Sequence, residues 1–356
     1  MKKIRVGIIF GGMSVEHEVS LQSAKNIYAA LDREKYESIL IGVDKKGKWL
    51  VLDSQKFLVD ENNPKNIAID SQKSHEIIPS EIRCEKLSID VAFPVIHGPY
   101  GEDGTLQGLL KLADVPFVGA GVLGSAVGMD KDIMKKLLRE SGIPVANFLV
   151  FRQGEEKPKF DLIKEKLGLP FFLKPANTGS SVGINKVHSE EEFIEAYQDA
   201  FQYDNKMIAE ECIQGRELEC SVLGNENPQT SVVGEVIPQY EFYSYEAKYL
   251  DENGAVLEIP AKITGELAEE AQGLAIKAFK VLECEGMARV DFFLRKDGKL
   301  FVNEINTIPG FTSISMYPRL WEASGISYKE LINRLIDLAL ERYQKDKKLK
   351  TDYQKL

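Results

Sequence analysis

Apolar residues in the first third of the chain form short continuous runs, separated by segments with a helical period. Runs of this length are typical of buried strands, whereas apolar positions three and four residues apart indicate helices. The expected strands are 4–10, 38–43, 91–96 and a short one at 116–119, and the expected helices are 19–31 and 105–112. This alternation predicts an α/β domain with a parallel sheet, in which the loops at the strand C-termini form the ligand crevice.

The pattern changes near residue 125, where strands and helices no longer alternate regularly. Asp130 can cap a helix that ends at Ser141, because a glycine and a proline follow. From about residue 217 the chain becomes β-rich, and a helix at 266–282 carries one apolar face. The other strands expected are 146–151, 171–174, 208–211, 218–223 and 231–237, with a last helix at 328–343. These parts of the chain are therefore predicted to be α+β.

Residues 287–306 are expected to form a hairpin, because two strand-like segments flank Asp297 and Gly298. Asp-Gly between alternating apolar residues is a strong signal for a two-residue hairpin turn. A loop of two residues pairs Lys296 with Lys299, and each step back on one strand then meets a step forward on the other. The register of the whole hairpin follows from this loop length.

In this register two acidic side chains face each other. Asp291 lies opposite Glu304, Arg289 lies opposite Asn306, and all four point to one side because side chains alternate along a strand. Like charges placed directly opposite are destabilising. Mg²⁺ is commonly bound by one or two carboxylates together with substrate phosphates. The hairpin therefore predicts a metal–nucleotide site with an arginine beside it.

Composition narrows the class of protein. The chain has 356 residues, 44% hydrophobic and 28% charged, which suits a globular protein of two or three domains. Its net charge of −10 argues against binding to nucleic acid or to an acidic membrane, since such proteins carry basic patches. No apolar run approaches the roughly 18 residues of a membrane span. The basic start MKKIRVGIIFGG has no cleavage site, so no signal peptide is expected.

The cysteines indicate a reducing compartment. Cys84, Cys212, Cys220 and Cys284 form no CxxC pair and do not lie at metal-ligand spacing with a histidine. We interpret them as inert thiols, and we expect the protein to be cytoplasmic.

A second candidate site follows a predicted strand. Lys174 ends that strand, and the loop after it holds Gly179, Ser180, Ser181 and Gly183. Small residues let backbone N–H groups approach a polyphosphate, and the lysine adds a point charge. The lysine precedes the glycines, so this is not a Walker A motif. A polyphosphate site and a polar hairpin turn fit this loop equally well.

Three further side chains are candidates for a functional role. Lys131 stands at a helix start, where its charge is unfavourable unless a phosphate binds there, but it also fits an exposed lysine. Glu16 lies in the loop after the first strand, where it can reach a ligand. His97 ends a strand in a Gly-rich loop, where a structural and a functional role are equally compatible with the pattern.

The segment 240–249, YEFYSYEAKY, contains four of the thirteen tyrosines of the chain. Its aromatic residues follow no strand period, and Glu246 and Lys248 do not suit a buried strand. We interpret the segment as a lid that excludes water from a site, with an aromatic edge strand as the alternative.

With these residues in view, the chain resembles the D-alanine–D-alanine ligases of the ATP-grasp superfamily. The motifs GGMSVEHEVS, HGPYGEDGTLQG, MDK, KPANTGSSVG, FYSYEAKY, MARVDFF and NEINTIPGFTSIS occur in order over almost the whole chain. The resemblance implies a three-domain ATP-grasp architecture, with ATP between the second and third domains. It implies a Rossmann-like, parallel-sheet substrate-binding domain at 1–124, a central subdomain at 125–215, and a catalytic domain at 216–356 with a lid loop at 236–250.

The resemblance also implies which residues bind ATP and metal. The expected ATP-binding residues are Lys131, Lys174, Ser180, Ser181 and Lys248 at the phosphates, Glu210, Glu211 and Ile213 in the adenine hinge, Glu217 at the ribose, and Phe292 and Asn303. Asp291, Glu304 and Asn306 would hold two Mg²⁺ ions, which Mn²⁺ could replace. K⁺ is a candidate activator. Cys212 and Ile213 differ from the basic and aromatic hinge residues of some relatives, which leaves base selectivity open.

Motif matches extend to the first D-alanine. Glu16 would hold its amine, with His97 near its carboxylate. Arg289 and the backbone of Gly310 would form the oxyanion site.

For the second D-alanine, Ser315 would bind the carboxylate, with Met316 beside it. Tyr249 would form a hydrogen-bonded triad with Ser180 and Glu16. A tyrosine at this lid position accompanies D-alanine as the second substrate in the family, so a dipeptide product is expected.

The implied reaction is the ATP-driven condensation of two D-alanines through an acylphosphate, for peptidoglycan precursor synthesis, by an expected homodimer. Another ATP-grasp carboxylate–amine ligase, or a D-alanine–D-lactate ligase, is the alternative, and Glu16, His97, Tyr249 and Ser315 would discriminate. A dinucleotide-dependent oxidoreductase is disfavoured, because GGMSVE is not GxGxxG. The metal set with Arg289 argues against a regulatory module without turnover.

Overall fold

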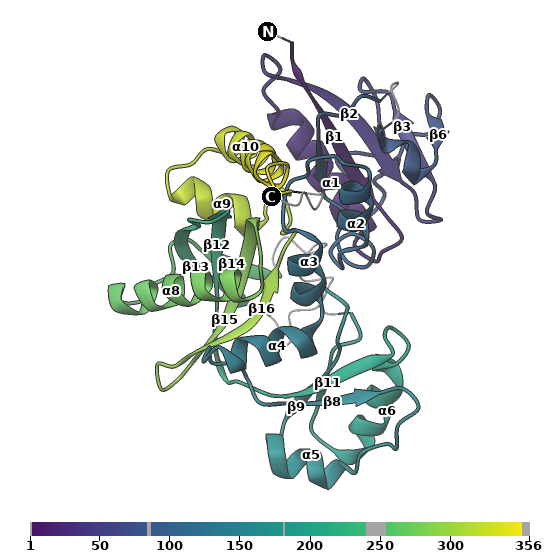
Figure 1. Ribbon diagram of the computed structural model, residues 1–356. Coiled ribbons are helices and arrows are strands. Elements are labelled where there is room, and N and C mark those ends of the chain that lie inside the picture. Colours follow the sequence, from purple (N-terminus) through teal and green to yellow (C-terminus); the bar gives the residue numbers. More distant parts are fainter. Residues whose placement is uncertain (1, 84–86, 181, 240–253, 351–356) are drawn as a thin grey trace, which may run out of the picture.

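The computed structural model describes residues 2–83, 87–180, 182–239 and 254–350. Within these ranges the strands form three larger sheets that follow one another along the chain, and one separate pair of short strands (Figure 1). The first and second sheets lie at opposite ends of the molecule, and the third lies beside the junction between them. The α/β class is confirmed, while the domain boundaries expected at 124 and 215 stay predictions.

The N-terminal sheet has a parallel centre and antiparallel edges. Its order is β6-β3-β2-β1-β7, with β1 parallel to β2 and β7, and β3 antiparallel to β2 and β6. The bounds are β1 Ile4–Gly11, β2 Tyr36–Val43, β3 Trp49–Leu52, β6 His75–Ile77 and β7 Val91–Pro94, with the separate pair β4 Leu58–Val59 and β5 Ala68–Ile69 and a 3₁₀ helix at Pro79–Arg83. The predicted parallel sheet is confirmed for the centre. The strand expected at 116–119 is only a bridge between Phe117 and Ala92.

Side chains of β1 enter two apolar layers, because they alternate between the faces of the sheet. Val6, Ile8 and Phe10 pack on the face covered by α1 and α10, whereas Ile9 packs on the face covered by α2. The helices are α1 His17–Ala30, α2 Thr105–Leu112 and α10 Tyr328–Asp346. The last helix of the chain therefore packs in the same core as the first sheet.

Two short helices connect the first and second sheets. They are α3 Val122–Met129, which the sequence does not predict, and α4 Lys131–Glu140. The predicted cap is confirmed: the Asp130 carboxylate accepts hydrogen bonds from the backbone N–H groups of Asp132 and Ile133, both at 3.1 Å. Gly142 follows the helix with φ +69°, a conformation that glycine adopts without strain.

The central sheet is antiparallel and is covered by two helices. Its order is β10-β9-β11-β8. The bounds are β8 Phe148–Arg152, β9 Phe171–Pro175, β10 Asn185–Val187, β11 Lys206–Glu211, α5 Phe160–Leu167 and α6 Glu190–Ala200. Ile163 of α5 and Phe193 of α6 pack against Phe171 and Leu173 of β9.

The C-terminal sheet is antiparallel and has a different helix on each face. Its order is β14-β13-β12-β15-β16. The bounds are β12 Gly215–Gly224, β13 Gln229–Pro238, β14 Ala255–Glu258, β15 Gly286–Arg295, β16 Leu300–Asn306, α8 Gly265–Val281 and α9 Met316–Ala323. Even-numbered residues such as Leu218 and Val290 pack with Ala271 and Ala278 of α8, as the predicted apolar face of that helix requires. The odd-numbered side chains of β12 and β15 therefore face the opposite side.

The predicted hairpin is present, but its loop length is wrong. The backbone N–H of Arg295 donates to the Lys299 carbonyl at 2.9 Å, so the loop has three residues and Gly298 adopts φ +86°. A bulge then restores the register, because Asn303 is the extra residue between the pairs formed by Asp291 and Phe292. The predicted pairs Asp291–Glu304 and Arg289–Asn306 are confirmed.

Nothing in the described ranges resembles a membrane span, since none of their helices combines the length and apolar character that one requires.

Two helical glycines provide a test of how closely α3 approaches the C-terminal part of the chain. A Cβ at Gly124 of α3 would lie 2.4 Å from the Glu283 carbonyl oxygen, whereas a Cβ at Gly108 of α2 would meet nothing within 4 Å. We expect Gly108→Ala to raise the free energy of unfolding by up to about 1 kcal/mol through helix propensity. Gly124→Ala should instead lower it by about 1–3 kcal/mol through overpacking. Urea titration measures both, and equal stability of the two variants would contradict the close approach.

Candidate active site

A cavity of about 470 Å³ brings together residues from distant parts of the sequence. It is lined by the start of α1, the loop after β7, the Gly/Ser loop, β12, β15, β16 and the segment after β16. The predicted site residues that line it are Glu16, His97, Ser180, Glu217, Arg289, Asp291, Phe292, Asn303, Glu304, Asn306, Gly310, Ser315 and Met316. Ser181, Lys248 and Tyr249 lie outside the described residues, as does most of the expected lid.

The facing carboxylates of β15 and β16 are compensated by two cations. The Arg289 guanidinium donates to both carboxylate oxygens of Asp291 at 2.7 Å, and its Nε lies 2.9 Å from Glu219 Oε2. Lys131 Nζ lies 3.6 Å from Glu304 Oε2. Glu219 belongs to β12 and is not among the residues predicted from the sequence. Arg289 is thus held between two carboxylates, which fixes the direction of its guanidinium group.

The residues present fit a divalent cation in part. Asp291 and Glu304 offer the hard oxygen ligands that Mg²⁺ prefers. The Asn306 side-chain N–H donates to Asp291 Oδ2 at 3.1 Å, so Asn306 must turn its amide to offer oxygen. Across 2–83, 87–180, 182–239 and 254–350, no three His, Cys, Asp or Glu side chains are grouped as a metal site. Substrate phosphates commonly complete the ligand set of a Mg²⁺ ion that is held by one or two carboxylates.

Three buried charges link α4 to the central sheet. Lys174 Nζ donates a hydrogen bond to Glu210 Oε1 of β11 at 2.6 Å, and Lys135 Nζ forms an ion pair with Oε2 of the same carboxylate, also at 2.6 Å. Burial by itself raises the pKa of Glu210, but Lys135 and Lys174 outweigh it and hold that pKa at about 2. The side chain of Glu210 is therefore occupied by two lysines of the protein itself.

Lys135 is the member of this group that the sequence analysis misses. It is 1% exposed, and its Nζ also donates to the Asn303 carbonyl of the bulge at 3.0 Å. Lys131 lies one helical turn earlier on the same face of α4, and its Nζ donates to the Thr178 carbonyl at 2.7 Å. The spacing of four residues between two lysines is the signal that could have identified Lys135.

The expected adenine hinge lies at the end of β11 and in the connection that follows it. The Glu211 carboxylate accepts hydrogen bonds from the backbone and side-chain nitrogens of Asn147, at 2.8 and 3.0 Å. Ile213 is half-buried in the connection to β12. Phe292 is buried among the residues of the α8 layer and also borders the cavity.

Two carboxylates meet at the N-terminal side of the cavity. The Ser180 hydroxyl donates to Glu16 Oε1. Glu102 accepts a hydrogen bond from the Gly98 backbone N–H at 2.7 Å. Burial raises the pKa of Glu102, and the charge of Glu16 raises it further. Glu102 is another residue that the sequence analysis misses, although it lies in the quoted motif HGPYGEDGTLQG.

His97 lies at the cavity but has both ring nitrogens engaged. Nδ1 donates to the Ile308 carbonyl at 3.0 Å, and Nε2 lies 3.2 Å from the Ser23 hydroxyl. Burial lowers the pKa of His97 to about 4, so the ring is neutral near pH 7. A neutral imidazole with these partners has no N–H left for the substrate carboxylate that the resemblance places beside it.

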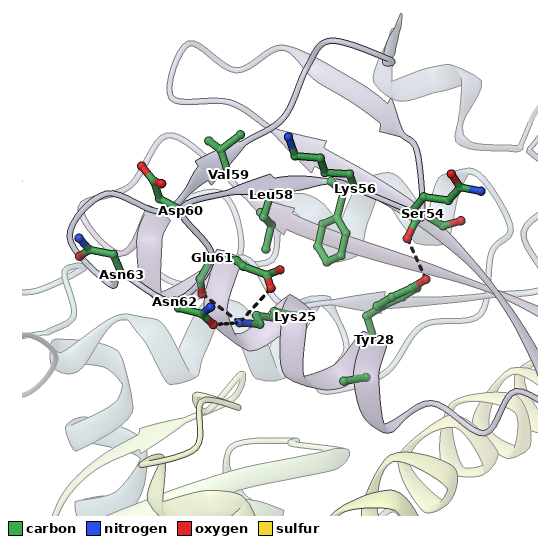
Figure 2. Close-up of a pocket in the computed structure, with 13 residues that line it drawn as sticks. Lys25, Tyr28, Ser54, Lys56, Leu58, Val59, Asp60, Glu61, Asn62 and Asn63 are labelled. Atoms are coloured by element: carbon green, nitrogen blue, oxygen red, sulfur yellow. Dashed lines mark hydrogen bonds and ion pairs between the residues drawn. The ribbon is translucent and has the colours of Figure 1, made fainter.

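A larger cavity of about 930 Å³ lies apart from this chemistry, between α1 and residues 54–63. Figure 2 shows its polar groups bonded to one another: Lys25 Nζ reaches the Asn62 side chain at 2.8 Å, and the Tyr28 hydroxyl donates to the Ser54 carbonyl. Because these polar groups already have partners, its size alone does not indicate a ligand. The smaller cavity, with its converging charges, is the candidate active site.

The buried triad of Lys135, Glu210 and Lys174 leads to a stability test. Lys135→Met leaves Glu210 with one partner and the Asn303 carbonyl without its donor, so the free energy of unfolding should fall by about 3–5 kcal/mol. Lys136→Met is the matched control, because Lys136 is exposed and its buried partner Asp132, one turn back, keeps Lys206 at 3.5 Å. It should cost at most about 1 kcal/mol. Urea titration compares the two, and similar losses would refute the importance of the buried pair.

Comparisons with known proteins identify the family of the chain. The family models described as "D-ala D-ala ligase N-terminus" and "D-ala D-ala ligase C-terminus" match residues 5–120 and 137–337. The D-alanine–D-alanine ligase of Oceanobacillus iheyensis is 54% identical over 362 residues, covering 99% of each chain.

Solved structures agree as well. The D-alanine-D-alanine ligase from Coxiella burnetii has a TM-score of 0.82 at 38% identity and covers 97% of this chain and 98% of that chain. The VanG D-Ala:D-Ser ligase from Enterococcus faecalis has a TM-score of 0.84 at 36% identity and covers 95% of this chain and 100% of that chain. On this evidence the chain belongs to the D-alanine–D-alanine ligase family, with the ATP-grasp fold.

Proposed function

We propose that this protein uses ATP to join two D-alanines into D-alanyl-D-alanine. The observation that supports this most directly is that Glu16, Arg289 and the facing carboxylates Asp291 and Glu304 line one cavity. An acidic group suits an amino acid's ammonium, and an arginine suits its carboxyl group. Carboxylates that can hold a cation suit the phosphates of a nucleotide. The chain belongs to the D-alanine–D-alanine ligase family, and a ligase of this kind needs all of these features in one site.

ATP would lie where the central and C-terminal sheets meet. Lys131, Lys174 and the Gly/Ser loop would contact its phosphates, and the backbone at Glu210 and Glu211 would contact the base. A divalent cation on Asp291 and Glu304, with Asn306 turned to offer its oxygen, would neutralise phosphate charge. We take Mg²⁺ as the natural ion, with Mn²⁺ as a substitute and K⁺ as a candidate activator.

The reaction begins when the first D-alanine is placed. Glu16 would hold the ammonium group of this D-alanine. An oxygen of the D-alanine carboxylate would then attack the γ-phosphorus of ATP. ADP leaves, and the carboxyl group becomes an acylphosphate. Arg289 would face the carboxyl oxygens, and its contacts with Glu219 and Asp291 keep it oriented.

Peptide-bond formation follows. The amine nitrogen of the second D-alanine attacks the acyl carbon, inorganic phosphate leaves, and the nitrogen loses a proton. Negative charge develops on the carbonyl oxygen during the attack, and Arg289 with the Gly310 N–H would stabilise it. Ser315 and Met316 would border the second D-alanine. Tyr249 is proposed to orient the attacking amine, and the lid at 236–250 to keep water from the acylphosphate.

The use of the product, the compartment and the oligomeric state are proposed from the family. The dipeptide would serve as a peptidoglycan precursor, and the enzyme would act in the cytoplasm, where ATP is supplied, as a homodimer.

The second substrate is the least determined part of the proposal, because VanG, named as a D-Ala:D-Ser ligase, shares the fold at 36% identity. A competition assay tests it. The protein is supplied with ATP, Mg²⁺ and D-alanine, together with equal D-serine and D-lactate, at pH 7. We expect mass spectrometry to show mainly D-alanyl-D-alanine. A mixed dipeptide or a depsipeptide as the main product would refute the acceptor, and no D-alanine-dependent ADP release would refute the function.

Arg289 provides the sharpest test of the oxyanion site. Arg289→Ala should lower kcat on the order of 10²–10³-fold, the usual effect of losing one oxyanion donor. Arg295→Ala is the matched control, since Arg295 is on the same strand and pairs with Asp297 in an exposed position. It should change kcat less than about twofold, because exposed ion pairs contribute little. A kcat for Arg289→Ala equal to that of the control would remove Arg289 from the mechanism.

A further inference from the structure

The segment after β16 carries Gly310 but belongs to no sheet. β16 ends at Asn306, so no ladder of backbone hydrogen bonds positions the residues that follow. Even so, Ile308 and Phe311, on either side of Gly310, are almost completely buried. Their backbone groups must therefore find partners elsewhere.

Those partners come mostly from the N-terminal sheet's helix and loop. Ser23 of α1 accepts a hydrogen bond from the Phe311 N–H at 3.1 Å, and Asn26 donates to the Phe311 carbonyl at 3.0 Å. His97 donates to the Ile308 carbonyl at 3.0 Å. Tyr328 of α10 also donates to the Phe311 carbonyl, at 2.7 Å.

The direction of each hydrogen bond follows from what each partner can do. The Ile308 carbonyl can only accept, so the proton of His97 is on Nδ1. Ser23 already accepts from the Phe311 N–H, and its own hydrogen is available to His97 Nε2 at 3.2 Å. Ser23, His97 and the segment therefore form one continuous network with a neutral imidazole. The low pKa of His97, caused by burial, agrees with this assignment.

Gly310 differs from its neighbours. It borders the cavity, and within the described part of the chain its N–H donates to no acceptor. The residues on both sides of it are held in place, so the position of this N–H is set by Ser23, Asn26 and His97. Ser23 and Asn26 do not line the cavity, so any effect they have must act through the segment.

The same helix also carries Glu16. Glu16 is the N-cap residue of α1, and Ser23 and Asn26 follow about two and three turns later on that rigid helix. One end of α1 therefore places a carboxylate in the cavity, while its middle holds the backbone around Gly310. An α-amino acid needs an ammonium partner and a carboxyl partner at a set separation.

We propose that Ser23 and Asn26, together with His97, are positioning residues that fix the Gly310 N–H relative to Glu16. This inference rests on the proposed ligase function and deepens it, because it assigns the N-terminal domain a part in the chemistry at the C-terminal sheet. The helix α1 sets the spacing between the groups that hold the two ends of the first D-alanine.

Loss of this positioning should affect the second chemical step most. The Gly310 N–H stabilises charge on the carbonyl oxygen when the amine attacks, so a displaced N–H slows that attack. The acylphosphate then persists, and water can add to it, which returns D-alanine and phosphate without dipeptide. The ratio of ADP released to dipeptide formed should rise above one.

The experiment compares Ser23→Ala with Ser20→Ala. Ser20 is a matched control on the same helix: it is fully buried and makes two hydrogen bonds, with the Gly11 N–H at 2.8 Å and the Val95 carbonyl at 2.6 Å, but none with the segment. We expect Ser23→Ala to lower dipeptide kcat on the order of 10- to 100-fold and to raise the ADP:dipeptide ratio. Ser20→Ala should keep a ratio near one. The melting-temperature shift caused by ATP should be the same in both.

Asn26→Ala is the second variant, because it removes a single hydrogen bond at a half-buried position and decides the matter if Ser23→Ala does not fold. Equal ADP:dipeptide ratios in Ser20→Ala and in the positioning variants would overturn the proposal.

Hydrogen exchange of the segment 307–314, followed by mass spectrometry, tests the anchoring without activity. It should be faster in Ser23→Ala and Asn26→Ala than in Ser20→Ala, and unchanged exchange would also overturn the proposal. If the wild type releases no ADP with D-alanine, the ligase function fails, and the exchange result still decides whether α1 anchors the segment.

Discussion

Two carboxylates facing each other on one hairpin are the constraint around which this site is organised. Asp291 and Glu304 would destabilise the pairing of β15 with β16 if their charges were not balanced. Arg289 and Lys131 supply the balance from two directions. Arg289 is held in turn by Glu219 of β12, and Lys131 reaches the Gly/Ser loop through Thr178. The charge network thus joins the central and C-terminal sheets at the cavity.

The N-terminal sheet completes the site through α1 and the loop after β7. Glu16 reaches the Gly/Ser loop through Ser180, while Ser23 and His97 reach the segment that carries Gly310. The side chains of the cavity therefore come from three different parts of the chain, each built around its own sheet. The side chains that each part contributes are held in place by contacts with another part. Under the proposed function, such a junction can assemble an amino acid, a nucleotide and an acceptor in one place and exclude water.

Much of the fold could be predicted from local patterns. The helix at 105–112, the Asp130 cap and the longer strands of all three sheets follow from periodicity and from turn residues, because these depend on neighbouring residues in the chain. Short elements such as β6 and α3 escaped prediction, since a few residues carry too little periodicity. For the hairpin, the predicted facing pair was correct but the predicted loop length was wrong. The loop has a third residue, and the bulge at Asn303 offsets it, so the register of the facing pair is unchanged.

Within the site, the sequence by itself determined which chemical groups are available: carboxylates on a hairpin, a lysine before a Gly/Ser loop, and motifs that identify the family. The sequence could not determine which side chains contribute indirectly, by holding another residue of the site in position. Lys135 and Ser23 look like ordinary helix residues in the sequence, and only long-range packing makes them buried partners of Glu210 and Phe311. Burial and hydrogen bonding between distant segments depend on how the sheets are placed relative to one another, and local patterns do not encode that placement.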